Sequence, residues 1–307
     1  MIRLILVRLA SALATVAGVA SIVFLLLHAV PGDPVEVMLG ESARPAEREA
    51  LRSALGLDRP LAEQWAGYLA RSARLDFGDS LHTRTPVTDL LAARLPATAA
   101  LAAAAIAIAA VIALPLGIFA AVRRGTRWDR LAIGFAVLGS ALPVFLLGPV
   151  LILLFAIRLQ WLPVSGAAGL AGLALPALTL GLALASGLTR MVRTAMLESL
   201  DEDCIRTARA KGLTERAVLL RHALRVAAVP IVTVLGLQIG ALLAGAVITE
   251  TLFSWPGLGG LLVESIHRRD YPVVQACVLA VGAAYVAVNA LTDLACGAVD
   301  PRARHSR

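Results

Sequence analysis

Six long apolar runs dominate the sequence and limit the folds that it can adopt. A transmembrane helix needs about 20 consecutive, predominantly apolar residues. Because each run is continuous and does not alternate with polar residues, we expect helices and not the strands of a barrel. The sequence therefore predicts an all-α integral membrane protein with six transmembrane helices. The runs span residues 9–30, 97–122, 131–157, 169–188, 229–252 and 273–299.

The composition and the placement of charge agree with this class. Hydrophobic residues make up 59% of the chain and charged residues 16%, against about 45–50% and about 25% in soluble domains. The formal net charge of +7 could suit a nucleic-acid partner, but most basic residues collect in alternate segments between the runs. Short loops rich in Lys and Arg stay on the cytoplasmic side. We therefore expect both termini in the cytoplasm, membrane lipid as a partner and no nucleic acid. The opposite side carries Arg158, Arg268 and Arg269 in its short loops.

The first run could also be the core of a cleaved secretory signal. It is longer than the core of such a signal, which has about 7–15 apolar residues, and no clear cleavage site follows, so we expect an uncleaved span. The predicted organisation has four parts. They are a cytoplasmic end with the first span (1–30), an extracytoplasmic helical segment (31–95), a five-helix core with a cytoplasmic loop at 190–228 (96–300) and a cytoplasmic tail (301–307).

The extracytoplasmic segment predicts a few short elements. Its opening PGDP (31–34) ends the first helix, because proline cannot continue it. Residues 45–56 and 60–74 each begin with a proline suited to a first helical turn and predict two amphipathic helices. A turn at 75–80 precedes a helix that begins at Pro86 and leads into the second run. So short a segment favours a small cap over the alternative, a separate ligand-binding domain.

One polar segment, residues 206–230 (RTARAKGLTERAVLLRHALRVAAVP), separates the fourth and fifth runs. Ser199 or Asp201 is placed to cap a short helix, whose acidic start and basic end suit its dipole. Gly212 is placed to end that helix, and Thr214 can cap the next. The sequence predicts two short helices joined by a compact elbow at the membrane surface. Such an elbow could dock on another protein or on anionic lipid.

This segment resembles the EAA loop of bacterial ABC importer permeases. Ala208, Gly212 and Pro230 match the loop, and Arg206 and Thr207 fit its peptide/nickel branch, where R-T-A-R-A-K-G is usual. The likeness covers nearly the whole chain and is strongest to the B-type dipeptide/oligopeptide permease subunit, although nickel and glutathione permeases share most of the motifs. The other matching stretches are LLHAVPGDP (26–34), LGLDRPL (55–61), LDFGDSL (75–81), RLPATAAL (94–101), LQWLPVSG (159–166), ITETLFSWPGLGGLL (248–262) and RRDYPVVQ (268–275).

The resemblance implies a type I ABC importer permease for di- or oligopeptides in the bacterial inner membrane. Nickel chelate, glutathione or another small peptide-like solute is the alternative cargo. The implied partners are a second homologous permease in a heterodimer, two cytoplasmic ATPase subunits and an extracytoplasmic solute-binding protein. The loop 201–228 would couple the ATPases to alternating access in the bundle. Its expected coupling residues are Arg206, Thr207, Ala208, Ala210, Lys211, Gly212 and Leu213.

The resemblance also implies that this chain is not an enzyme and binds no cofactor, since ATP and Mg would belong to the partner subunits. The sequence shows no Walker-type ATP site and no hydrolase motif. The histidines and the three cysteines show no metal-ligand spacing. An intramembrane enzyme would need a catalytic pair that we do not find. An ATP-independent secondary carrier is a remote alternative, because it would leave the elbow unexplained.

Polar residues within the apolar runs are the candidates for a translocation path or gate, because burying them in a membrane is costly. Each could instead form a hydrogen bond between helices. The resemblance places a turn at the outer mouth of the path, for which an interfacial aromatic anchor is the alternative. The path candidates are Gln238, Thr249, Glu250, Asn289 and Asp293, and the turn is formed by Trp255, Pro256 and Gly257.

Overall fold

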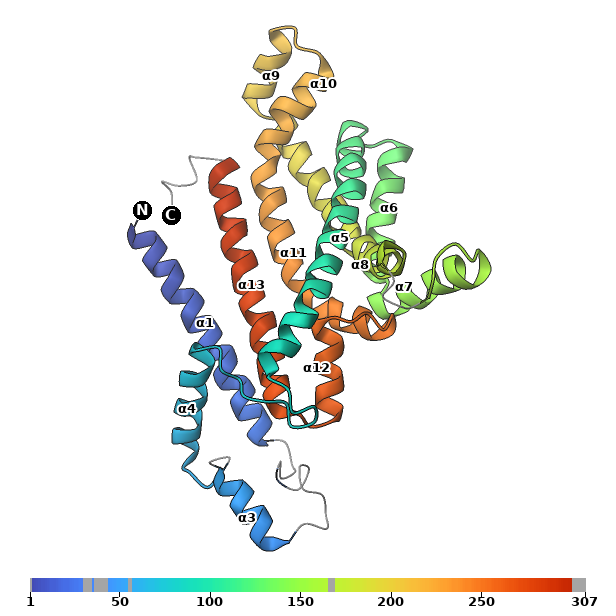
Figure 1. The fold of residues 1–307 in the computed structure, drawn as a ribbon. Helices are drawn as coiled ribbons and strands as arrows, with labels where there is room; N and C mark the ends of the chain where they lie inside the picture. Colours follow the sequence, from blue (N-terminus) through green and yellow to red (C-terminus); the bar gives the residue numbers. More distant parts are fainter. Residues whose placement is uncertain (1, 30–34, 36–43, 55–56, 165–168, 300–307) are drawn as a thin grey trace. The chain divides into compact units, whose positions relative to one another are not determined.

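The computed structural model describes residues 2–29, 35, 44–54, 57–164 and 169–299, which are mainly helical (Figure 1). The chain forms two compact units. Unit 1 comprises Met1–Thr98 and Pro256–Val286, and unit 2 comprises Ala99–Trp255 and Ala287–Arg307. Because these units reflect contacts and not sides of a membrane, the predicted boundary at residue 95 stays a prediction. The predicted tail (301–307) and the PGDP stretch (31–34) lie outside the described residues.

Unit 1 contains the helices expected in the extracytoplasmic segment. The two predicted amphipathic helices are confirmed as α3 (Pro45–Ala54) and α4 (Leu61–Ala73). Helix α4 packs on α1 (Ile2–Ala29), where Phe24 stacks on Tyr68 with ring centroids 5.6 Å apart. The remaining helices of unit 1 are the first part of α5 (Val87–Val122), α12 (Leu258–His267) and the first part of α13 (Tyr271–Val299).

Unit 2 is organised around a central helix, α8 (Gly169–Leu200), which packs against both α6 (Arg127–Ala141) and α11 (Leu224–Leu252). Small residues permit these close approaches, since a methyl group added at Gly139 would lie 2.6 Å from Cβ of Ser186. The other elements of unit 2 are α7 (Val144–Leu151), η1 (Ile152–Arg158), α9 (Asp203–Ala210), α10 (Glu215–Ala217), η2 (Val218–Ala223) and the remaining parts of α5 and α13.

Five helices of the described residues are long and apolar enough to span a membrane, and a bent helix pair would make a sixth span. The predicted third span, 131–157, is a bent pair of helices and not one straight helix. Helix α6 ends at Ala141, and the chain turns by 105° into α7 and η1. Leu142 is extended (φ −85°, ψ 116°) because the proline that follows it disfavours helical backbone. Pro143 therefore breaks the run.

The predicted ends of the fourth and fifth spans also change. Helix α8 continues to Leu200, well past the predicted end at residue 188. The elbow's second helix was expected to run towards Pro230, where the fifth span would begin or bend, and one uninterrupted helical run covers Glu215–Leu252. Pro176 and Pro230 lie inside continuous helices and do not end them. Neighbouring helices can supply the packing and hydrogen bonds that a proline removes in a membrane protein.

Candidate functional site

The predicted elbow is present as α9, a turn and α10, which lie at one end of α8 and α11 in unit 2 (Figure 1). We call residues 203–217 the coupling elbow. Gly212 has a φ of 76°, a left-handed conformation in which glycine is favoured, and it ends α9 as predicted. The predicted cap by Thr214 is also confirmed, because its hydroxyl accepts a hydrogen bond from the Ala217 N–H at 3.4 Å.

The cap predicted for the start of α9 is wrong. Helix α9 begins after Glu202, whose side chain makes no capping hydrogen bond. Ser199 belongs to α8 instead, and its hydroxyl donates to the Ala223 carbonyl oxygen at 2.7 Å. Asp201 lies in the turn between α8 and α9. The serine therefore joins the end of α8 to the end of η2, just before α11, and does not cap α9.

The seven expected coupling residues separate into an exposed set and one buried member. Ala208 is only 4% exposed and belongs to a core cluster that includes Ile205 and Val218. Its methyl group therefore holds α9 against the bundle and is not presented to a partner. The exposed residues are Arg206, Thr207, Ala210, Lys211, Gly212 and Leu213.

Two ion pairs form between side chains of the elbow. Arg206 pairs with Asp203 at 3.1 Å, and Arg209 reaches across the turn to Glu215 at 3.0 Å. All four side chains are at least 45% exposed, and such pairs contribute only about 0–1 kcal/mol. The conformation of the elbow therefore depends mainly on its buried core and its glycine turn.

A second basic turn, between α5 and α6, lies at the same end of unit 2 as the elbow (Figure 1). It is held by Asp129, whose carboxylate accepts two hydrogen bonds from Arg193 of α8, at 2.6 and 2.9 Å. The same carboxylate accepts the Gly125 N–H at 2.9 Å. Sequence reasoning treated Arg193 only as a sign of topology and missed Asp129. The available signal was a lone acid within a basic loop.

The five candidate path residues fall into two groups within unit 2. Thr249 and Glu250 are fully buried near one end of α11, and the Thr249 hydroxyl donates to the Gly245 carbonyl oxygen at 3.1 Å. Gln238 lies 12 residues before Glu250 in α11, which corresponds to about 18 Å along the helix. The structure therefore does not gather the five candidates into one site.

Gln238 belongs to the second group, with two half-buried residues of α13, Asn289 and Asp293. It lies beside α8, since a methyl group added at Gly187 would be 3.0 Å from its Nε2 atom. Helices α11 and α13 run close together, because a methyl group at Gly236 would be 2.3 Å from the Thr292 side chain. Gln238 therefore lies where α11 meets α8, and Asn289 and Asp293 lie on α13, which approaches α11 at Gly236.

The predicted outer turn is anchored at both of its ends. The Trp255 N–H donates to the Glu250 carbonyl oxygen at 2.8 Å, and the indole packs partly buried against the core of unit 2. This burial fits a turn fixed to the bundle better than an exposed membrane anchor. Pro256 and Gly257 begin the stretch that belongs to unit 1. There the Leu258 N–H donates to the Thr98 hydroxyl at 2.8 Å.

Unit 1 contains a buried polar contact that sequence reasoning did not find. The Ser80 hydroxyl donates to Asp270 at 2.5 Å, and the Leu81 N–H donates to the same carboxylate at 3.1 Å. Ser80 and Asp270 are 1% and 3% exposed. The two residues belong to LDFGDSL and RRDYPVVQ, so this contact explains why both stretches occur in one chain. No local pattern indicates that they meet.

Comparisons with known proteins agree with the helical membrane architecture. Residues 113–305 match the family model "Binding-protein-dependent transport system inner membrane component", and residues 1–102 match the model of its N-terminal part. A structure of the MetNI methionine ABC transporter in an inward-facing conformation shares the fold. Its TM-score is 0.57 at 21% identity, over 69% of this chain and 96% of that chain.

Two curated relatives from Escherichia coli (strain K12) match along their whole lengths. The dipeptide transport system permease DppB is 41% identical over 339 residues, covering 100% of both chains. The glutathione transport system permease GsiC is 41% identical over 306 residues, covering 99% of this chain and 100% of the relative. The chain therefore belongs to the family of binding-protein-dependent transport system inner-membrane components. It is an ABC importer permease of the peptide/nickel branch, a multi-pass inner-membrane transport subunit that works with ATPase partners and a binding protein.

Proposed function

We propose that this permease imports di- or oligopeptides. The observation that carries the proposal is the 41% identity with both DppB and GsiC along their full lengths. The names of those relatives specify a dipeptide and glutathione, and glutathione is itself a small peptide. A peptide is therefore the cargo class that the two relatives share, and we assign that class to this chain.

Glutathione or a similar short peptide is the second candidate, and alignment length favours it. The alignment with GsiC spans 306 positions, nearly the length of this chain, whereas that with DppB spans 339. The chain thus lacks residues that DppB carries and matches GsiC without large gaps. A nickel chelate is the remaining alternative from the branch as a whole.

We propose a heterodimer with a second permease, on which two ATPase subunits act through the coupling elbow. The exposed elbow residues, among them Thr207, Ala210 and Leu213, would contact an ATPase. ATP and Mg²⁺ would be held by the ATPases, and this chain would bind no cofactor. The basic α5–α6 turn lies at the same end of unit 2 as the elbow, which supports a cytoplasmic location for that end (Figure 1). The distribution of basic residues along the sequence supports the same location for both termini.

For the path, we propose separate roles for the two polar groups. Gln238, Asn289 and Asp293 lie on helices that meet within unit 2, so they would face the permeating solute when the bundle opens. Thr249 and Glu250 are fully buried next to the anchored Trp255 turn. They would form the gate at the outer end, because a change in that turn would change their burial. Alternating access of this kind requires different contacts in its two states.

Uptake measured in the native strain tests the cargo. A strain lacking this chain would be compared with one complemented by it, using a labelled dipeptide and labelled glutathione, each with an excess of the other as competitor. Complementation should restore uptake of at least one of them, and uptake should stop when ATP is depleted. Restored uptake of neither solute, with a nickel-dependent growth defect in the deletion strain, would assign the chelate cargo instead.

A further inference from the structure

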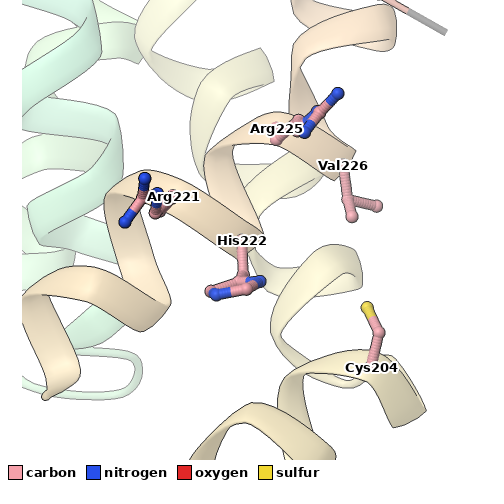
Figure 2. Close-up of a pocket in the computed structure, with 5 residues that line it drawn as sticks. All are labelled: Cys204, Arg221, His222, Arg225 and Val226. Atoms are coloured by element: carbon pink, nitrogen blue, oxygen red, sulfur yellow. The ribbon is translucent and has the colours of Figure 1, made fainter. Parts of the chain in front are cut away.

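A pocket of about 400 Å³ lies at the N-terminal end of α11, between this helix and the coupling elbow. Figure 2 shows Arg221, His222, Arg225 and Val226 along one stretch of helix, with Cys204 of α9 across from them. The volume falls within the range of about 300–1,000 Å³ that is typical of small-molecule sites. The pocket combines two guanidinium groups and an imidazole, all hydrogen-bond donors, with an apolar Val226 edge.

Of the basic residues near this pocket, some form ion pairs with other described residues and some, such as Arg216, do not. Arg206, Arg209 and Arg193 each pair with a carboxylate. Within the described part of the chain, no carboxylate forms an ion pair with Arg221 or Arg225. The pocket therefore presents two positive charges that the described residues do not neutralise, and an anion would bind there without displacing a partner among them.

The pocket also lies at the edge of the membrane-spanning part of the helix. After Arg225, no charged residue occurs in α11 before Glu250. A helix this apolar begins its hydrocarbon span just beyond Arg225. Groups at that depth meet the phosphate layer of the lipid headgroups. Basic pockets beside transmembrane helices on the cytoplasmic side are a known setting for anionic headgroups.

The local backbone places two of these donors side by side. Residues Val218–Ala223 form the π-helical segment η2, and such segments often occur at functional sites. Arg221 and His222 lie within η2, and Arg225 follows in the first turn of α11. The Ser199 hydroxyl fixes this segment by donating to the Ala223 carbonyl oxygen. The three donors are therefore held by a backbone that is tied to α8.

We propose that this pocket binds the phosphate of an anionic phospholipid headgroup. The guanidinium groups of Arg221 and Arg225 would donate charge-assisted hydrogen bonds to the phosphate oxygens, and His222 would add a third donor. The acyl chains would continue along the apolar surface of α11 beyond Val226. A lipid bound there would contact both the elbow and the fifth span. The inference concerns lipid and does not depend on the cargo or on the identity of the ATPases.

Cys204 supplies a reporter, because it lines the pocket and its side chain is free and exposed. The chain would carry Cys277→Ala and Cys296→Ala, and it would be placed in nanodiscs of phosphatidylcholine with increasing phosphatidylglycerol. The measurement is the rate at which an uncharged maleimide labels Cys204, expressed relative to phosphatidylcholine alone. Phosphatidylglycerol should slow the labelling. The quantity compared is the fraction of phosphatidylglycerol that halves the labelling rate. In Arg221→Gln/Arg225→Gln this fraction should rise by more than tenfold, since each arginine near an anionic surface contributes about fivefold to lipid affinity.

Matched variants separate a specific site from general surface charge. Arg127→Gln/Arg130→Gln removes the same charge from exposed positions of α6, and it should leave the protection unchanged. Arg221→Lys/Arg225→Lys keeps the charge and should retain most of the protection, which also shows that the region tolerates substitution. Equal protection in the wild type and the Gln variant would overturn the proposal. The proposal would also be overturned if the α6 control lost as much protection of Cys204 as the Gln variant. Protection of Cys204 by millimolar inorganic phosphate in phosphatidylcholine nanodiscs would overturn it as well. Loss of peptide uptake with intact lipid protection would count against the proposed function alone.

Discussion

Arg193 and Asp129 form a two-point contact in which Nε and Nη2 of the arginine donate to the two carboxylate oxygens, at 2.6 and 2.9 Å. The contact joins α8 to the start of α6 and, through Gly125, to the turn before it. The Asp129 side chain is 4% exposed and that of Arg193 is 21% exposed. Removing one partner therefore leaves a largely buried charge without compensation.

We expect Asp129→Asn and Arg193→Gln each to lower the stability of the purified protein by about 3 kcal/mol. The double variant should lose less than the sum of the two, with a coupling energy of about 1–3 kcal/mol. Thermal unfolding in one detergent measures all three. Arg190→Gln changes an exposed arginine one turn away and should have little effect. Additive losses would show that the two side chains act independently.

Gly212 allows a test of the elbow's geometry, because its φ is 76° and a side chain added there would meet open space. Any defect in the fold of a variant of this chain therefore comes from the backbone and not from a clash within the chain. Gly212→Asn should be tolerated, since asparagine adopts this conformation more readily than most residues. Gly212→Val and Gly212→Pro should lower transport while ATP hydrolysis by the assembled complex continues. Normal uptake with Gly212→Pro would contradict the coupling role of the elbow.

Ala208 and Ala210 form a matched pair of one buried and one exposed alanine on α9. Ala208→Leu overfills the chain's own core and should destabilise it by about 1–3 kcal/mol. Ala210→Leu should leave stability unchanged and weaken capture of the ATPase subunits. Melting temperature and co-purification, measured on both variants, separate the two effects. The docking assignment fails if Ala210→Leu and larger residues at that position keep full ATPase binding.

Gly236 and Thr292 test the contact of α11 with α13, where a methyl group on the glycine would lie 2.3 Å from the threonine side chain. Gly236→Ala should lower stability by about 1–3 kcal/mol through overpacking. Thr292→Ala, added to Gly236→Ala, should recover part of that loss, because it removes the two side-chain atoms at 2.3 Å and leaves Cβ at 2.8 Å. Unfolding curves of the single and double variants provide the comparison. A double variant no more stable than Gly236→Ala would place the strain elsewhere.

Asp270 accepts hydrogen bonds from the Ser80 hydroxyl and the Leu81 N–H in the interior of unit 1. Asp270→Ala should leave these donors buried without acceptors, at a cost of about 2–3 kcal/mol. Hydrogen exchange at residues 76–86 should then rise strongly, with less change in α11. Glu264→Ala, which breaks an exposed ion pair with Arg268, is the control and should leave the exchange unchanged. Unchanged exchange in Asp270→Ala would show that other contacts hold the loop.

The sequence predicted the local features of the elbow and of the extracytoplasmic helices. Gly212 and Thr214 act through the backbone close to them, so their roles can be recognised without knowing the tertiary fold. The helices α3 and α4 are likewise indicated by their opening prolines and their apolar spacing. The apolar runs indicated a membrane protein, and the resemblance added the ABC importer permease family, which the comparisons confirm.

Features that depend on distant partners were not predictable. The burial of Ala208 depends on residues of α8 and η2, and the role of Ser199 depends on a carbonyl 24 residues away. Proline position alone does not distinguish Pro143, which breaks a run, from Pro176, which does not. The difference lies in the tertiary packing around each residue. The contact of Ser80 with Asp270 joins residues 190 positions apart.

The uninterrupted helical run from Glu215 to Leu252 has a mechanical consequence. Its 38 residues would be about 57 Å long, and no loop interrupts them. A displacement imposed at the Thr214 end is therefore transmitted as the tilt or translation of a single rod, whose far end carries Thr249 and Glu250. The π-helical segment at residues 218–223 departs from regular α-helix within this rod, and the Ser199 hydroxyl ties it to α8. A push at the Thr214 end would reach Thr249 and Glu250 only as far as that segment and its contact with α8 resist bending.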